Sequence, residues 1–91
     1  MFRTAMIAFA MVAGASMAKA DVAAGDACAA NLTPDGKAVY AAVVAANPTL
    51  ETLRATVEHQ ARSLVMESKI AMGSARDNAT AAGECVRTRL Q

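Results

Sequence analysis

Aromatic side chains are scarce in this chain, whose 91 residues include no tryptophan, one tyrosine and two phenylalanines. Phe2 and Phe9 both lie near the N-terminus, so Tyr40 is the only aromatic residue in the rest of the sequence. Nucleic-acid-binding domains usually combine a basic stripe with aromatic side chains that stack on bases, and neither feature is present. We therefore expect no nucleic-acid partner and a core of medium-sized aliphatic residues.

Residue types that carry catalysis or bind metals are also scarce. The chain has one histidine, His59, and two cysteines, which are too few ligands for a usual zinc site. Helical spacing places His59 almost opposite the apolar stripe of its segment, which predicts an exposed side chain without a neighbouring nucleophile. No Gly-x-Ser-x-Gly turn, phosphate loop or dinucleotide fingerprint occurs. We expect no catalytic, cofactor-binding or metal-binding residues, and therefore a protein that is not an enzyme.

The N-terminal segment, residues 1–20, has the pattern of a bacterial secretory signal peptide. Arg3 supplies a short basic region, and residues 5–17 form an uncharged apolar run. The run is followed by a small-x-small ending at residues 18–20 and is shorter than the roughly 20 residues that a membrane-spanning helix requires. We predict cleavage after Ala20, export to the periplasm or the medium, and no stable membrane span in the mature chain.

Removal of this segment leaves a small chain with little net charge. Lysine plus arginine falls from 9 to 7 because Arg3 and Lys19 are lost, while all 8 acidic residues remain. So balanced a chain implies no strongly basic or acidic partner. A domain of this size buries a small fraction of its surface, so it needs a stabilising feature beyond its core.

A disulfide is the simplest source of that stabilisation. Cys28 and Cys85 lie near opposite ends of the mature chain, and in an oxidising compartment they are expected to form one structural bridge. Closing so long a loop stabilises a fold by about 4 kcal/mol on the chain-entropy model. A redox-active pair would more typically be a Cys-x-x-Cys motif. Intermolecular pairing and free thiols are the remaining alternatives.

Three helices are predicted after a loose, alanine-rich entry segment in which Asp26 begins at most a short helical turn. The first helix covers residues 34–46. Thr33 is a suitable N-cap, and Pro34 suits the first helical position. Asn47 and the proline that follows it end this helix.

The second predicted helix, residues 49–67, has the clearest amphipathic pattern. Its apolar residues recur at spacings of three and four, which aligns them in one stripe that must face another helix or a partner. Charged residues at the same spacings form a ladder on the solvated face. The ladder comprises Glu51, Arg54, Glu58 and Arg62. The stripe supplies a candidate apolar contact face made of Leu50, Leu53, Val57 and Leu64.

The third predicted helix covers residues 75–89. Ser74 and Asp77 resemble a capping box with aspartate in place of the usual glutamate. Small alanines on the inward face allow close helix approach, and Cys85 lies on the same side, within reach of Cys28. The predicted fold is therefore all-α, a single domain over residues 21–91, arranged as a three-helix bundle closed by one disulfide.

Two classes of function remain. The first is a small periplasmic protein that binds a partner protein or peptide through an apolar helix face. In size, compartment and single disulfide its predicted architecture is similar to that of the periplasmic acid-stress chaperones, which implies a chaperone-like role in envelope stress. The second is a structural or regulatory subunit that docks constitutively on an envelope protein or on another copy of itself.

Overall fold

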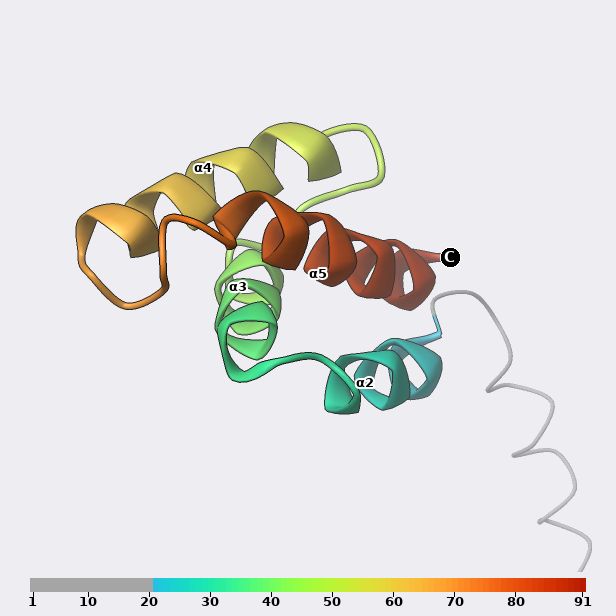
Figure 1. The fold of residues 1–91 in the computed structure, drawn as a ribbon. Coiled ribbons are helices and arrows are strands. Elements are labelled where there is room, and N and C mark those ends of the chain that lie inside the picture. Colours follow the sequence, from blue (N-terminus) through green and yellow to red (C-terminus); the bar gives the residue numbers. More distant parts are fainter. Residues whose placement is uncertain (1–20) are drawn as a thin grey trace, which may run out of the picture.

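The computed structural model describes residues 21–91, which contain four helices and no strand (Figure 1). The signal peptide predicted from the sequence and its cleavage site after Ala20 lie outside the described residues. The all-helical class and the Cys28–Cys85 disulfide are confirmed, whereas the predicted number of three helices is wrong. The helices are α2 (Val22–Ala30), α3 (Pro34–Ala45), α4 (Leu53–Met66) and α5 (Ala75–Leu90).

The additional helix is α2, which occupies the entry segment that the sequence led us to expect as loose. Its N-cap is Asp21, whose Oδ1 accepts a hydrogen bond from the Ala24 N–H at 3.0 Å, so the helix begins at Val22 and not near Asp26. Alanine supplies most of its nine residues and is the strongest helix former. The apolar residues of α2 are distributed around the whole helix, so no periodic stripe marked it in the sequence.

Helix α3 begins as predicted. Thr33 Oγ1 accepts a hydrogen bond from the Gly36 N–H at 3.0 Å, and Pro34 is the first helical residue. The helix ends at Ala45, one residue earlier than expected, and Asn47 then adopts a φ of 56°. Asparagine tolerates this left-handed conformation, so the turn is made without glycine.

Helix α4 begins at Leu53 and not at residue 49 as expected. The preceding residues form a turn in which the Thr49 N–H donates to Thr52 Oγ1 at 2.9 Å and the Thr52 N–H donates to Thr49 Oγ1 at 3.2 Å. These side chains satisfy backbone groups that a longer helix would otherwise have used. Leu50 lies in this turn and is 47% exposed, so the expectation that it continues the helical stripe is wrong.

The end of α4 is a Schellman motif. The Lys69 N–H donates to the Leu64 carbonyl at 2.8 Å, and the Ser68 N–H donates to the Val65 carbonyl at 2.9 Å. Ser68 occupies the left-handed position that glycine usually takes, with a φ of 62°. This backbone geometry turns the chain back toward the core, where Ile70 of the connecting loop is buried.

Helix α5 begins at Ala75 as predicted and ends at Leu90. The predicted capping box is wrong, because the Ser74 side chain caps no backbone group of α5. Ser74 Oγ instead accepts a hydrogen bond from Asn78 Nδ2 at 3.2 Å. The start of α5 therefore has no side-chain cap on its backbone.

Helix α5 is the central element and packs against each of the other three helices. It forms an antiparallel hairpin with α4, while α3 crosses below the hairpin and α2 lies along the C-terminal half of α5 (Figure 1). Within residues 21–91, no helix combines the length and the apolar character needed to cross a bilayer. The largest of the fully buried side chains come from α3 and α5 and are Val39, Val43, Cys85 and Val86.

Candidate functional site

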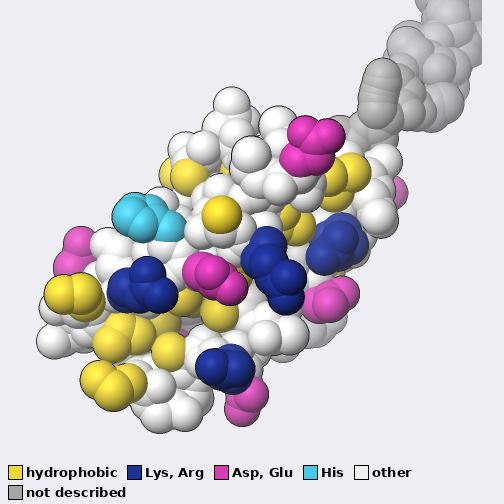
Figure 2. Space-filling view, turned by 90° about the horizontal axis from the view of Figure 1, so that it is seen from above, with side chains coloured by type: hydrophobic (Ala, Val, Ile, Leu, Met, Phe, Trp, Pro, Cys, Tyr) yellow, Lys and Arg dark blue, Asp and Glu magenta, His cyan; other side chains and the backbone are white. Residues whose placement is uncertain are grey.

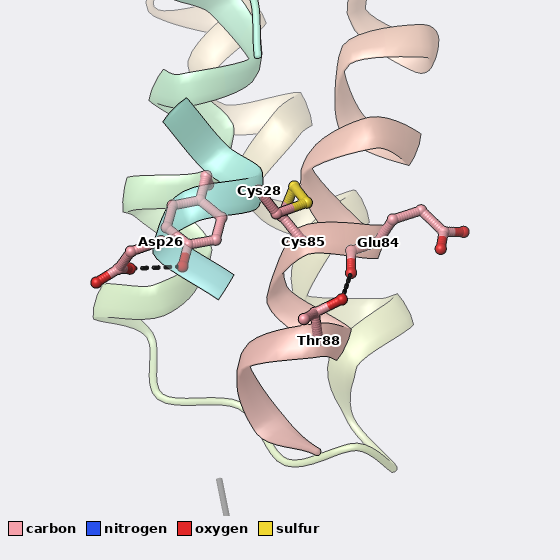
Figure 3. Close-up of a disulfide and its surroundings, with 6 residues drawn as sticks. Asp26, Cys28, Glu84, Cys85 and Thr88 are labelled. Carbon is pink, nitrogen blue, oxygen red and sulfur yellow. Dashed lines mark hydrogen bonds between the residues drawn. A yellow bond between two sulfur atoms is a disulfide. The ribbon is translucent and has the colours of Figure 1, made fainter. Parts of the chain in front are cut away.

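The two cysteines are joined to each other in a structural position. Their Cα atoms are 5.4 Å apart, and the bridge links α2 to α5 (Figure 3). Cys85 is 1% exposed, and neither cysteine of the described chain is a free thiol. The pair therefore holds α2 on the central helix.

The four residues of the candidate apolar contact face do not stay together. Leu53 and Val57 are buried at the α4–α5 contact, Leu64 is half-buried, and Leu50 is exposed before the helix begins. Leu53 and Val57 also line a groove between α4 and α5, whereas Leu50 and Leu64 do not. The contact face predicted from α4 alone is thus replaced by a groove that two helices form.

The α4–α5 groove has an apolar floor, and the residues that α5 contributes to this floor are small. A Cβ added to Gly83 would lie 3.5 Å from Val57 Cγ2, so the two helices are close together at this point. Neither α2 nor α3 contributes a residue to the lining. The floor consists of Leu53, Val57, Ala61 and Val65 from α4 and of Ala75, Ala79 and Gly83 from α5.

Charged side chains stand on both rims of the groove. Four arginines and two glutamates line it, although acidic residues outnumber basic ones over residues 21–91. Figure 2 views the molecule from the α4 side and shows basic and acidic side chains interspersed with apolar ones. The arginines are Arg54, Arg62, Arg76 and Arg87, and the glutamates are Glu58 and Glu84.

None of these six rim charges forms an ion pair within the described chain. The ion pairs among residues 21–91 are Lys69 with Glu67 at 3.6 Å and Arg89 with Asp26 at 2.9 Å. The charge ladder expected along α4 therefore lacks ion-pair contacts, and its arginines extend beside the groove. They are available to charges that another molecule brings.

A polar cluster outside the groove connects α2, α3 and α5. Asp26 Oδ1 of α2 accepts hydrogen bonds from Tyr40 Oη of α3 and from Arg89 Nη1 of α5, both at 2.9 Å (Figure 3 shows the former). Burial raises the pKa of Tyr40 above its ordinary value of 10.0; the bond to Asp26 raises it further, and Arg89 opposes the shift. The cluster fixes helices in place, and none of its three residues lines the α4–α5 groove.

The structure assembles no recognisable catalytic set in residues 21–91. His59 is exposed, as predicted, and takes part in no side-chain hydrogen bond there. No three histidine, cysteine, aspartate or glutamate side chains of this region come together as a metal site would require. The α4–α5 groove is therefore the feature of the described chain that best fits a binding function.

The apolar half of this groove was recognisable from the sequence. The apolar positions of α4 were evident from their spacing, and the small residues of α5 indicated a close helix approach. The two α4 arginines, Arg54 and Arg62, were expected on a solvated face, because one helix by itself does not show which charges will border a groove shared with another helix. A signal was present in the spacing of Ala75, Ala79 and Gly83, four residues apart on one side of α5.

We compared the chain with protein-family models, with curated proteins and with solved structures, and none of the three comparisons finds a match.

Proposed function

We propose that this protein is a small exported helical protein that binds a partner protein or peptide in the α4–α5 groove. The observation that carries the proposal is the groove itself, with an apolar floor, six charged rim residues and no cover from α2 or α3. An apolar centre with a polar rim is the usual anatomy of a protein interface. Arginine is also enriched in such interfaces, because its guanidinium group contributes both packing surface and hydrogen bonds.

Export is supported by two features that are independent of the groove. Residues 1–20 have the composition of a secretory signal, with a basic start, an apolar run and a small-x-small ending. The Cys28–Cys85 disulfide is typical of proteins that reside in an oxidising compartment. These two features support the proposal of a periplasmic or secreted location.

A chaperone-like role in envelope stress is a narrower form of the proposal and needs an acid-sensitive contact. The ion pair between Arg89 Nη1 and Asp26 Oδ1, at 2.9 Å, is the candidate contact because it joins α2 to α5. The ladder on α4 makes no ion pairs that acid could break within the described chain. Such a role would therefore depend on the contact between α2 and α5.

Constitutive docking on an envelope protein or on a second copy is the alternative form. In a self-complex that pairs two α4–α5 grooves, the four arginines of one copy would approach the four of the other. Like charges placed opposite one another are destabilising at an interface. The groove therefore favours a different protein or peptide over another copy.

Site-specific crosslinking tests the proposal. A photoreactive amino acid at Ala79, in the groove wall, is expected to give one adduct of defined mass when the protein is irradiated in its native compartment. The matched control places the same amino acid at Ala41, which is exposed on α3 and outside the groove. Equal adducts from both positions, or none from Ala79, would contradict the proposal. An adduct of twice the mass of the chain would establish self-association instead.

A further inference from the structure

We propose that the occupant of the α4–α5 groove is an amphipathic helix of the partner, with carboxylates near both of its ends and none at its centre. This inference rests on the proposed function and specifies the chemistry of the ligand. It follows from the shape of the groove and from the positions of the rim charges. It also follows from the absence of ion pairs between these charges and any other residue of 21–91.

The shape of the groove suits a helix. Its floor extends along α4 from Leu53 to Val65, which corresponds to about 18 Å or roughly three helical turns. A partner helix laid along the α4–α5 pair would present one apolar stripe to this floor, as in other helix-in-groove complexes. An extended peptide would lack the sheet edge on which strands usually add, because residues 21–91 contain no strand.

The rim charges have a defined order along the groove. The close approach of Gly83 to Val57 sets the antiparallel register of the two helices. Counting residues from this contact along the two antiparallel helices (Figure 1) places Arg54 across from Arg87 at one end and Arg62 near Arg76 at the other. The glutamates fall between the two arginine pairs. Each end of the groove is therefore basic, and its middle is acidic.

This order distinguishes the proposed ligand from other anionic ones. Glu58 and Glu84 would repel the continuous phosphate backbone of a nucleic acid, and no aromatic side chain lines the groove to stack on a base. A helix with acidic ends and a basic centre would place an opposite charge beside each of the charged rim residues. Carboxylates also form bidentate hydrogen bonds with arginine, which fixes the position of the ligand along the groove.

Two synthetic helical peptides test the inference. Both have about 14 residues, the same apolar stripe and equal numbers of glutamate and lysine, so that composition and net charge are identical. The first has glutamates at its ends and lysines at its centre, and the second has the reverse order. We expect the disulfide-bonded protein to bind the first at least about tenfold more tightly in calorimetric titration, with a difference that decreases as salt is added.

Matched protein variants locate the binding. The double variant Arg62→Glu and Arg76→Glu reverses one basic end and is expected to weaken binding of the first peptide by about tenfold or more. The control, Lys37→Glu with Lys69→Glu, makes the same change in net charge at exposed positions outside this groove and should alter affinity by less than about twofold. Circular dichroism of both variants verifies that the helices are retained.

Several results would overturn the inference. These are equal binding of the two peptides, tighter binding of the second, binding of neither, or unchanged binding to Arg62→Glu with Arg76→Glu. Displacement of the first peptide by a duplex oligonucleotide would indicate that the groove recognises phosphate groups and not a helical peptide. If the peptides fail while the crosslink from Ala79 persists, the ligand chemistry is wrong but the groove still binds a partner. If both fail, the proposed function fails as well.

Discussion

Asp26 is a single residue at which three helices meet. One of its carboxylate oxygens accepts hydrogen bonds from Tyr40 of α3 and from Arg89 of α5. The aspartate side chain is 59% exposed, so its ion pair with Arg89 contributes only about 0–1 kcal/mol. The more informative partner is Tyr40, which is 9% exposed and whose hydroxyl donates to Asp26 Oδ1.

The raised pKa of Tyr40 predicts a loss of stability in alkali. The neutral phenol is favoured in the folded state, so the contribution of this group is fully present below the unfolded pKa of about 10 and decreases as pH rises through the higher folded pKa. Because the chain contains one tyrosine and no tryptophan, tyrosinate absorbance follows this group alone. The absorbance midpoint should be higher in the folded protein than in urea.

The variant Tyr40→Phe is the control for this effect. It should lower the free energy of unfolding at neutral pH by about 0.5–1.5 kcal/mol, because the hydrogen bond to Asp26 is lost. In this variant the free energy of unfolding should also decrease less as pH rises through the alkaline range, because the ionising hydroxyl of Tyr40 is absent. Identical tyrosinate midpoints in folded and unfolded wild-type protein would contradict the assignment.

At the scale of elements, the distance between α2 and α5 depends on Gly25. A Cβ added at this position would lie 2.8 Å from Arg89 Cα, a backbone atom that cannot move aside as a flexible side chain can. The close approach is also held by the Asp21 N–H, which donates to the Arg89 carbonyl at 3.1 Å. Glycine is therefore required here by packing between two helices, although both are ordinary helices in their backbone conformation.

Gly25→Ala should destabilise the protein by about 1–3 kcal/mol, because the added methyl group forces α2 away from α5. Urea unfolding followed by circular dichroism measures the change. Gly83→Ala is the matched control, since its Cβ would make ordinary contact with Val57 at 3.5 Å. That control should be neutral or stabilising by up to about 1 kcal/mol, because alanine is the better helix former. Equal effects of the two substitutions would disprove the packing explanation.

At the scale of the whole molecule, the disulfide links the first described helix to the last. Its cysteines are 57 residues apart in the sequence, so the bridge closes almost the entire described chain. Helix α2 packs mainly on α5, and the bridge supplements a contact surface made of small side chains. The helices α3, α4 and α5 share the larger buried residues and depend on it less directly.

Replacing both cysteines by alanine should lower the free energy of unfolding by about 4 kcal/mol on the chain-entropy model. Helix α2 should be affected most, so its amides should lose protection from hydrogen exchange more than those of α3 and α5. Urea unfolding and hydrogen exchange measure the two effects. The reduced wild-type protein provides the control, since it lacks the bridge but keeps both side chains. Uniform loss of protection over all four helices would contradict the localised effect.

Local signals in the sequence predicted the parts of this fold that depend on neighbouring residues. Thr33, Pro34 and Asn47 correctly placed both ends of α3 to within one residue, because caps and turns are formed by groups close together in the chain. The same kind of signal failed at Ser74, whose side chain bonds to Asn78 and caps nothing. It also failed at Leu50, where two threonines form a competing turn.

The remaining features depend on which elements meet. The sequence by itself determined an all-helical chain, the positions of three of its helices, and a disulfide between its two cysteines, because periodicity, caps and cysteine count act locally or by elimination. Only the tertiary structure decided that α2 is a helix held against α5, and that four arginines border a shared groove. A groove exists only where two helices lie side by side. The charges on its opposite rims come from residues more than ten positions apart in the chain.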